Sequence, residues 1–235
     1  MSIYHLHIPR TSGVYIRNNI VPNLISKGIP HFASNRTKID IETISNSKLV
    51  IGHFGRMPLK YMDSPKVFCL LRDPVDRYVS YFKYNTGYRT IQGSAEENLE
   101  QWLYKEQSVV QANLQSKFLT GSTNIEEFNK HINYIDSSVN NAWHLEDYSL
   151  DIDKIKESMS NINIYTMDNY DKFKFDFNEE IQKQFGFKVF KYSDKSNESP
   201  EIKVQLDQSH LKRIKELNEI DYEVYEYVQK TQKRY

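Results

Sequence analysis

The sequence is short of cysteine and of long apolar runs, and each shortage excludes a class of protein. Its 235 residues include a single cysteine, Cys69, so an intrachain disulfide cannot form. The apolar run around Cys69 favours a buried thiol in a reducing compartment over a catalytic nucleophile. No apolar stretch approaches the ~20 residues that a membrane-spanning helix needs, and the N-terminus lacks a signal-peptide pattern. We therefore expect a cytoplasmic protein without a membrane span.

The charges are balanced, and the chain lacks repeats. Lys+Arg and Asp+Glu both number 31, giving a formal net charge of zero. This balance opposes wholesale electrostatic binding of nucleic acid or of an anionic membrane. Without internal repeats or long linkers, a chain with 39% hydrophobic residues can bury one sizeable core, and we expect a single domain over residues 1–235. The histidines lack the spacing of a structural metal site, so we expect no metal.

Short apolar runs alternate with helical patterns along the chain. The runs typical of strands are Ile3–Ile8, Lys48–His53, Lys66–Arg72 and Ile162–Thr166. The helical patterns cover Val14–Ser26, Pro74–Lys83, Glu96–Phe118, Asp171–Phe185 and Ser209–Lys230. Pro22 is expected to kink the first helix or to end it early. The alternation predicts an α/β fold with a mainly parallel sheet flanked by helices, in which ligands gather at the carboxyl ends of the strands.

The first strand ends in HIPRTSGVYI, residues 7–16. A strand–turn–helix connection of this kind directs backbone N–H groups and the positive end of a helix dipole at whatever lies above it, which suits a phosphate. Arg10 adds a fixed positive charge, and Thr11 and Ser12 add hydroxyl donors. A plain connection without a ligand explains the same residues. The GxxxxGK[ST] loop is absent, which weakens the case for a common nucleotide hydrolase.

The segment LLRDPVDRYVSYF marks a second strand end. Asp73 followed by proline is a favoured helix start. Arg72 ends the strand beside this helix, and Ser80 lies on its polar face; an arginine fork with a hydroxyl donor binds a phosphate. Arg77 shares the polar face, where an ion pair with Asp73 or Asp76 is favoured over ligand contact. Two separate anion-binding corners suit a ligand with phosphates at both ends.

These segments resemble a known family. HIPRTSG is similar to the HIPKTGG loop, and LLRDPVDRYVSYF to the RDPxxRxxSxY segment, of the carbohydrate-type sulfotransferases that include the heparan sulfate 2-O-sulfotransferases. Further similarity lies in IGHF (Ile51–Phe54), in NLQSKFLTG (Asn113–Gly121), which is close to the NLQTRxLxG of bacterial members, and in the C-terminal NEIDYEVYEY. The resemblance covers nearly the whole chain and implies a P-loop-like α/β fold in one sulfotransferase domain.

The resemblance also implies ligands and residue roles. It implies 3′-phosphoadenosine 5′-phosphosulfate (PAPS) as donor, 3′,5′-adenosine bisphosphate (PAP) as product, and a hydroxyl of a saccharide or small metabolite as acceptor, without a metal. The 5′-phosphosulfate would be bound by Arg10, Thr11, Ser12, Gly13, Val14 and Tyr15. Arg72 and Ser80 would bind the 3′-phosphate, and His7 would position the loop.

His53 stands where the family has a proposed general base, and Arg10 would stabilise the leaving phosphate. A histidine suits the first role because its unperturbed pKa of ~6.5 lies near neutral pH. Packing or hydrogen bonding at the strand end explains a histidine at this position as well.

Two departures from the family pattern leave alternatives open. Arg10 replaces the loop lysine; it keeps the charge but cannot donate its proton outright. Val14 and Tyr15 replace a hydroxyl pair, so two side-chain donors to the 5′-phosphate are missing. Besides a sulfotransferase, the sequence is therefore compatible with a P-loop-like small-molecule or nucleotide kinase, and with a catalytically impaired nucleotide-binding module.

Overall fold

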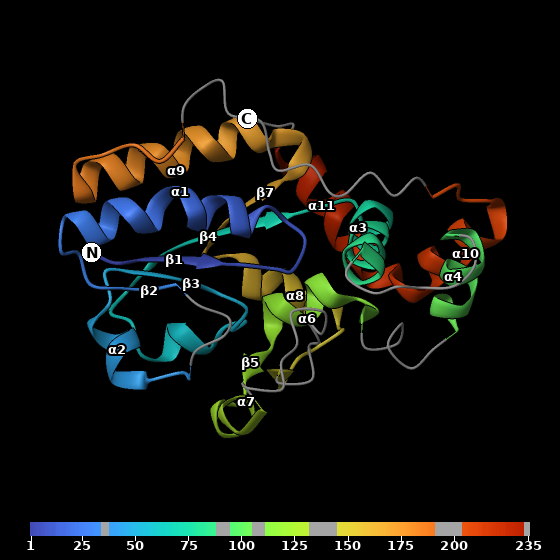
Figure 1. Cartoon of the computed structure of the whole chain (residues 1–235), viewed down its shortest axis with the longest axis horizontal. Helices are drawn as coiled ribbons and strands as arrows, with labels where there is room; N and C mark the ends of the chain where they lie inside the picture. Colours follow the sequence, from blue (N-terminus) through green and yellow to red (C-terminus); the bar gives the residue numbers. More distant parts are fainter. Residues whose placement is uncertain (34–37, 88–94, 105–110, 132–144, 191–203, 233–235) are drawn as a thin grey trace.

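The computed structural model describes residues 1–33, 38–87, 95–104, 111–131, 145–190 and 204–232 (Figure 1). Within these residues, five parallel strands form one sheet in the order β2-β3-β1-β4-β7. The strands are β1 (Ile3–Leu6), β2 (His31–Ala33), β3 (Leu49–Gly52), β4 (Lys66–Leu71) and β7 (Ile162–Thr166). A second, two-stranded antiparallel sheet joins β5 (Ser122–Thr123) and β6 (Leu145–Glu146). The predicted α/β fold is confirmed.

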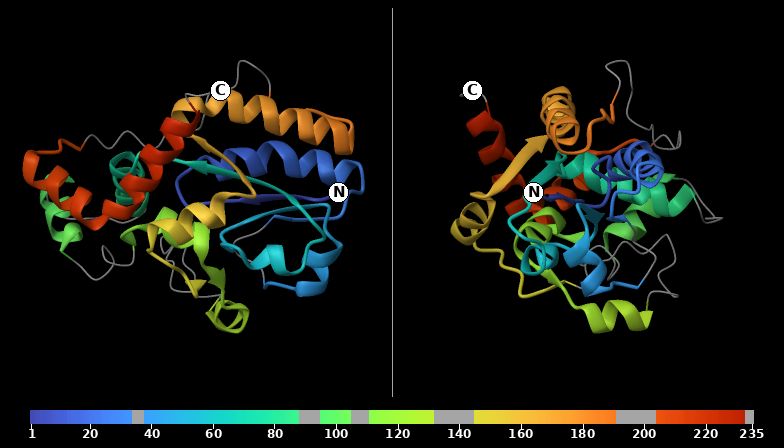
Figure 2. Two further views of the ribbon diagram at one scale, coloured as in Figure 1. Left: turned by 180° about the vertical axis from the view of Figure 1, so that it is seen from behind. Right: turned by 90° about the vertical axis from the view of Figure 1, so that its left-hand side faces the viewer.

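Helices cover both faces of the large sheet. One face carries α1 (Gly13–Ser26) and α9 (Tyr170–Phe185). The other carries α2 (Ile41–Asn46), α6 (Leu114–Thr120), α8 (Ile152–Met159) and α11 (Glu219–Gln232). The second view in Figure 2 shows the sheet between these two layers. β4 lies between both layers and is buried on both faces, which explains why its sequence is continuously apolar.

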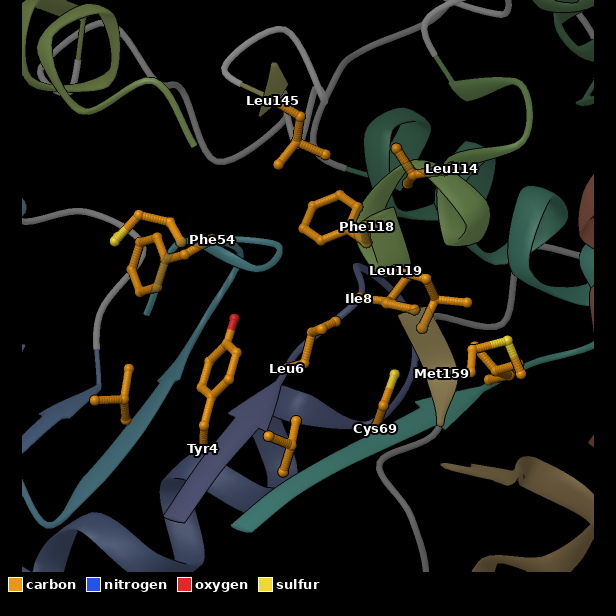
Figure 3. Packing of buried hydrophobic residues seen from close by; sticks show 14 of the residues in the cluster. Tyr4, Leu6, Ile8, Phe54, Cys69, Leu114, Phe118, Leu119, Leu145 and Met159 are labelled. Atoms are coloured by element: carbon orange, nitrogen blue, oxygen red, sulfur yellow. The ribbon is translucent and has the colours of Figure 1, made fainter. Parts of the chain in front are cut away.

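The two faces of β4 and its neighbours supply separate cores. Leu6 and Cys69 lie on the α6 side of the sheet and share one core cluster with Phe118 and Leu119 (Figure 3). Phe68 faces the opposite way, toward α1 and α9. Cys69 is a free, fully buried thiol, as its apolar surroundings in the sequence predicted.

A third, smaller cluster lies at one end of the molecule. It joins α3 (Pro74–Gly87), α4 (Ala95–Leu103) and α10 (Gln208–Leu217) through buried aromatic and aliphatic residues. Figure 1 and Figure 2 both show α4 and α10 projecting beyond the sheet on the side of α3. The remaining described α-helix, α7 (Ile125–His131), follows β5, and two short 3-10 helices cover Met57–Lys60 and Met167–Asn169.

The single helix predicted over Glu96–Phe118 is wrong. The described part of that range contains two helices, α4 and α6, and Asn113 with φ 48° breaks the helical path just before α6. The helix predicted over Ser209–Lys230 is likewise divided, at Asn218, whose amide Nδ2 donates to the Ile214 carbonyl (2.8 Å) and competes with the backbone. β2 has three residues and was not predicted.

The first helix continues to Ser26 despite Pro22. Pro22 is exposed, so water can reach the carbonyl that loses its N–H partner there.

The strand order creates a switch point at β1. From β1 the chain moves to β2 and β3 on one side and then crosses to β4 on the other, so β1 lies between β3 and β4. In open α/β sheets, ligands bind in the crevice beyond the carboxyl end of such a strand. The loop after β1 therefore lies at the favoured ligand position of this fold.

Candidate functional site

The loop between β1 and α1 has an unusual backbone. Arg10 and Ser12 both have positive φ, 73° and 66°, a conformation that non-glycine residues rarely adopt. Left-handed residues alternating with others turn successive N–H groups toward one concave side, which binds anions. The first hydrogen bond of α1 runs from the Ile16 N–H to the Ser12 carbonyl (3.1 Å). The N–H groups of residues 13–15 precede that bond and lie at the positive end of the helix dipole.

Gly13 is required by close contact with His7. A Cβ atom at Gly13 would lie 2.0 Å from Nε2 of His7, so the imidazole packs directly on the helix start. His7 itself is 4% exposed, and burial lowers its pKa well below the ordinary value, with further lowering from His53 and His5. The neutral ring of His7 thus supports the loop by packing.

The loop side chains divide between structural and outward positions. Thr11 is fully buried, and its hydroxyl donates to the Ile8 carbonyl within the loop (2.8 Å). Val14 is exposed, and Tyr15 stacks on Phe190 with ring centres 5.9 Å apart. The Ser12 hydroxyl lies 3.8 Å from Sδ of Met167. Backbone N–H groups, rather than side-chain hydroxyls, are therefore the main anion donors that this loop offers.

His53 follows β3 and is oriented by the neighbouring strand end. Its Nδ1 lies 2.8 Å from the His7 carbonyl oxygen, and its ring lies 4.2 Å from the His7 ring and 6.1 Å from Phe118. A carbonyl oxygen only accepts hydrogen bonds, so in neutral His53 the proton is on Nδ1 and Nε2 carries the lone pair. His53 is thus prepared to accept a proton at Nε2.

The two sequence segments beyond β1 and β4 meet through Arg10. Its Nε donates to Oγ of Ser80 on α3 at 3.1 Å, across 70 residues of sequence. Ser80 is 3% exposed, and Arg10 is half-buried. The structure thus joins the loop and the α3 corner that the sequence predicted as two separate anion sites.

Arg72 follows β4, and its backbone is hydrogen-bonded to a side chain of α6. The Gln115 side chain accepts from the Arg72 N–H and donates to its carbonyl, both at 2.9 Å. Within the described part of the chain, the Arg72 guanidinium makes no hydrogen bond or ion pair. Burial lowers the pKa of Arg72, and the charges of Asp76 and Asp73 oppose that shift. An arginine remains charged under these conditions, so Arg72 offers a cation at the carboxyl edge.

The predicted ion pair of Arg77 is wrong. Arg77 is fully buried, and its Nη2 donates to the Gln111 carbonyl at 3.0 Å. Burial lowers the pKa of Arg77, and the largest opposing influence is the charge of Asp221 rather than that of Asp73 or Asp76. The helical pattern gave α3 one buried face, whereas α10 and α11 also pack against it. Asp73 instead caps α3, accepting from the N–H groups of residues 75 and 76 at 2.9 and 3.0 Å, as its sequence position predicted.

A buried hydrogen-bond network between α6 and α11 was not predicted from the sequence. Asp221 of α11 accepts hydrogen bonds from the N–H groups of Gln115 (3.0 Å) and Ser116 (2.8 Å) and from the Ser116 hydroxyl (2.6 Å). Asn113 Oδ1 in turn accepts from the N–H groups of Ile220 (3.0 Å) and Asp221 (3.1 Å). Each helix start is thus capped by the other segment. The family resemblance included both segments. No local sequence pattern, however, indicated that they contact one another.

This network holds α6 over His53. The ring of Phe118 on α6 meets the His53 ring edge to face, with ring centres 6.1 Å apart, and Phe118 belongs to the core cluster drawn in Figure 3. Lys117, on the same helix, is 9% exposed, and its pKa is lowered mainly by burial. Among the described residues, no group of three or more His, Cys, Asp or Glu side chains is arranged to hold a metal, and no helix is long and apolar enough to cross a membrane.

Comparison with known proteins identifies the family of the chain. A search of curated proteins finds no match. A sequence model of the sulfotransferase family matches residues 56–228, which include Arg72, Ser80, Asn113 and Asp221 and begin just after His53. Since the match spans well over half of the 235 residues, the chain belongs to the sulfotransferase family.

Proposed function

We propose that the protein transfers the sulfuryl group of PAPS to a hydroxyl of a saccharide or small metabolite. The observation that carries this proposal is the Arg10–Ser80 hydrogen bond of 3.1 Å, which brings the α1 loop and the α3 corner together. With Arg72 at the end of β4, the edge offers two cations, a hydroxyl and a helix start. Such a donor set suits a nucleotide that carries phosphate groups at both its 5′ and 3′ positions.

The residues fit the two ends of that nucleotide in different ways. The N–H groups at the start of α1 and the guanidinium of Arg10 would hold the 5′-phosphosulfate. Arg72 and Ser80 would hold the 3′-phosphate, the arginine through its planar fork and the serine through its hydroxyl. With the hydroxyl pair replaced by Val14 and Tyr15, backbone N–H groups would supply the remaining donors, and the left-handed conformation of Arg10 and Ser12 supports that role.

The chemistry requires proton removal from the acceptor and charge stabilisation on the leaving phosphate. PAPS, when bound, supplies the activated sulfuryl group. His53 would take the acceptor proton at Nε2, while the His7 carbonyl holds Nδ1–H and stabilises the imidazolium that forms. Arg10 stays protonated, so it would stabilise the leaving phosphate by charge and hydrogen bonding rather than by proton donation.

The finer assignments rest on the sequence. The acceptor class comes from the resemblance to heparan sulfate 2-O-sulfotransferases, and the cytoplasmic location from the composition and the lone cysteine; both stay predictions.

Labelled-sulfate transfer from PAPS to a panel of hydroxyl acceptors tests the proposal. We expect His53→Ala to lower turnover at least about 100-fold, the usual minimum for a lost general base, while PAP binding is kept. His31→Ala is the matched control, because His31 lies in β2 with its Nδ1 on the Ile29 carbonyl (2.8 Å).

Three other outcomes would contradict parts of the proposal. Undiminished turnover in His53→Ala removes this residue from the base role. PAP binding without transfer to any acceptor indicates a nucleotide-binding module. Magnesium-dependent phosphoryl transfer from ATP indicates the kinase.

A further inference from the structure

Tyr84 lies on α3 one turn after Ser80, and its ring meets Arg10. The guanidinium carbon of Arg10 lies 4.7 Å from the centre of the Tyr84 ring, while Nε of the same side chain donates to Ser80. Residues four apart on a helix share a face. α3 therefore contacts one guanidinium at two points, through a hydroxyl and through an aromatic ring.

We propose that Tyr84 is a positioning residue, whose ring fixes the plane of the Arg10 guanidinium so that its N–H edge faces the leaving phosphate. This inference rests on the proposed function. An arginine lies with its flat face on an aromatic ring and keeps its N–H groups in the plane for hydrogen bonds, whereas a lysine ammonium has no such plane. The resembled family has lysine at this position, so the ring suits the arginine of this chain in particular.

The placement of Tyr84 separates it from the other aromatic residues of α3. Tyr78, Tyr81 and Phe82 are buried in the cluster with α4 and α10. Tyr84 is only partly buried, and its ring contacts Arg10, whose backbone is left-handed (φ 73°). A long side chain on a loop otherwise loses rotamer freedom when it binds a ligand, and the ring restricts Arg10 before the ligand arrives.

A double-mutant cycle tests the role. Tyr84→Leu and Tyr84→Phe are made in the wild type and in Arg10→Lys, and kcat, KM for PAPS and Kd for PAP are measured. We expect Tyr84→Leu to lower kcat about tenfold, the size of a partly desolvated cation–π contact, with a smaller change in KM. Tyr84→Phe keeps the ring and most of the rate. In Arg10→Lys, we expect Tyr84→Leu to add little.

Tyr104→Leu is the matched control. Tyr104 is exposed and lies under Arg213 at 5.5 Å, so it has the same kind of contact outside the site. We expect its kcat to equal that of the wild type. An equal loss from Tyr84→Leu in the wild type and in the Arg10→Lys background would show a merely structural role and overturn the proposal.

The ligand-free protein separates this inference from the proposed function. In a ¹H–¹⁵N spectrum, the Arg10 Nε–H resonance should shift in Tyr84→Leu and stay near its wild-type position in Tyr84→Phe, because the ring current is lost only in the first variant. An unchanged resonance in Tyr84→Leu overturns the stacking itself. A shifted resonance in a protein that fails to bind PAP overturns the proposed function, and with it the role of Tyr84.

Discussion

Polar residues gather at two places along the carboxyl edge of the sheet, and they are used in opposite ways. In the loop of residues 7–15, Arg10 and Ser12 have strained left-handed backbone, and the Arg10 guanidinium reaches Ser80 close to the N–H groups that begin α1. Between α6 and α11, Asp221 and Asn113 accept from the N–H groups that begin the partner segment. We therefore propose the loop as the ligand site, whereas the mutually satisfied buried groups hold α6 and α11 together.

We expect the largest loss of stability when the hydrogen bonds between α6 and α11 are removed. Asp221→Ala removes the acceptor of three hydrogen bonds and the carboxylate whose charge acts most strongly on the buried Arg77. We expect the free energy of unfolding to fall by about 3–5 kcal/mol, because two buried N–H groups lose their acceptor and the buried Arg77 loses the negative charge that acts on it most strongly. Urea denaturation measures it, with exposed Asp153→Ala as control. A loss below about 1 kcal/mol would show that the network is dispensable.

Gly13→Ala probes how closely the loop is packed. The added Cβ would meet the His7 ring at 2.0 Å, so the loop or the imidazole must move. We expect a loss of about 2 kcal/mol in stability, typical of overpacking, together with loss of transfer, since His7 also holds His53. Asn18→Ala on the same helix is the control, because Asn18 is exposed and lies outside the loop. A Gly13→Ala variant with full activity and stability would contradict the packing.

Acid is expected to destabilise the strand that leads into the loop. Burial lowers the pKa of His5 to about 3, and His7 shifts in the same direction. The unfolded chain takes up a proton at each histidine near pH 6.5, whereas the folded chain does not, so stability falls as the pH drops below about 6.5. Between pH 7 and 5.5 we expect a loss of about 1 kcal/mol per histidine.

His5→Phe identifies the source of that pH dependence. His5 packs against Phe173 and Phe177, so phenylalanine suits its surroundings. Urea denaturation at both pH values should show a smaller acid loss in this variant. An unchanged pH dependence would mean that other groups take up the protons.

Ser80→Ala should have the smallest effect of these variants. In contrast to Asp221→Ala, it should lower the affinity for PAP and leave the stability unchanged. Losing one neutral hydroxyl donor costs about 1 kcal/mol, or about fivefold in the Kd for PAP. The unfolding midpoint should stay unchanged, since water can replace Ser80 as the partner of half-buried Arg10. Calorimetric titration measures the affinity. Marked destabilisation with unchanged PAP affinity would place Ser80 with the structural residues instead.

The local sequence pattern correctly predicted the sheet and the helix start at Asp73. It did not predict the contacts between segments that are far apart in the sequence. The continuous apolar run of β4 and the Asp73 cap were readable because each depends on neighbouring residues. The bonds between Asp221 and α6 span 105 and 106 residues, and no local periodicity encodes them. Arg77 was misplaced for the same reason: its burial depends on helices far along the chain.

In the candidate site, the sequence predicted which residues take part but not which residues they contact. Arg10, Ser80 and His53 were singled out by strand ends and by family resemblance. The left-handed backbone, the packing of His7 on Gly13 and the contact of Tyr84 with Arg10 depend on the folded loop. The spacing of four between Ser80 and Tyr84 was the one available signal for the last of these.

The central claim is that this edge binds a nucleotide with phosphates at both ends. Its most direct test is calorimetric titration of PAP and of AMP, which lacks the 3′-phosphate, into the wild type and Arg72→Ala. We predict that the wild type prefers PAP by at least about tenfold, since a charged hydrogen bond contributes about 1.5–3 kcal/mol, and that Arg72→Ala largely removes this preference while AMP affinity stays unchanged. Equal affinity of the wild type for PAP and AMP, or an undiminished preference in Arg72→Ala, would contradict the account.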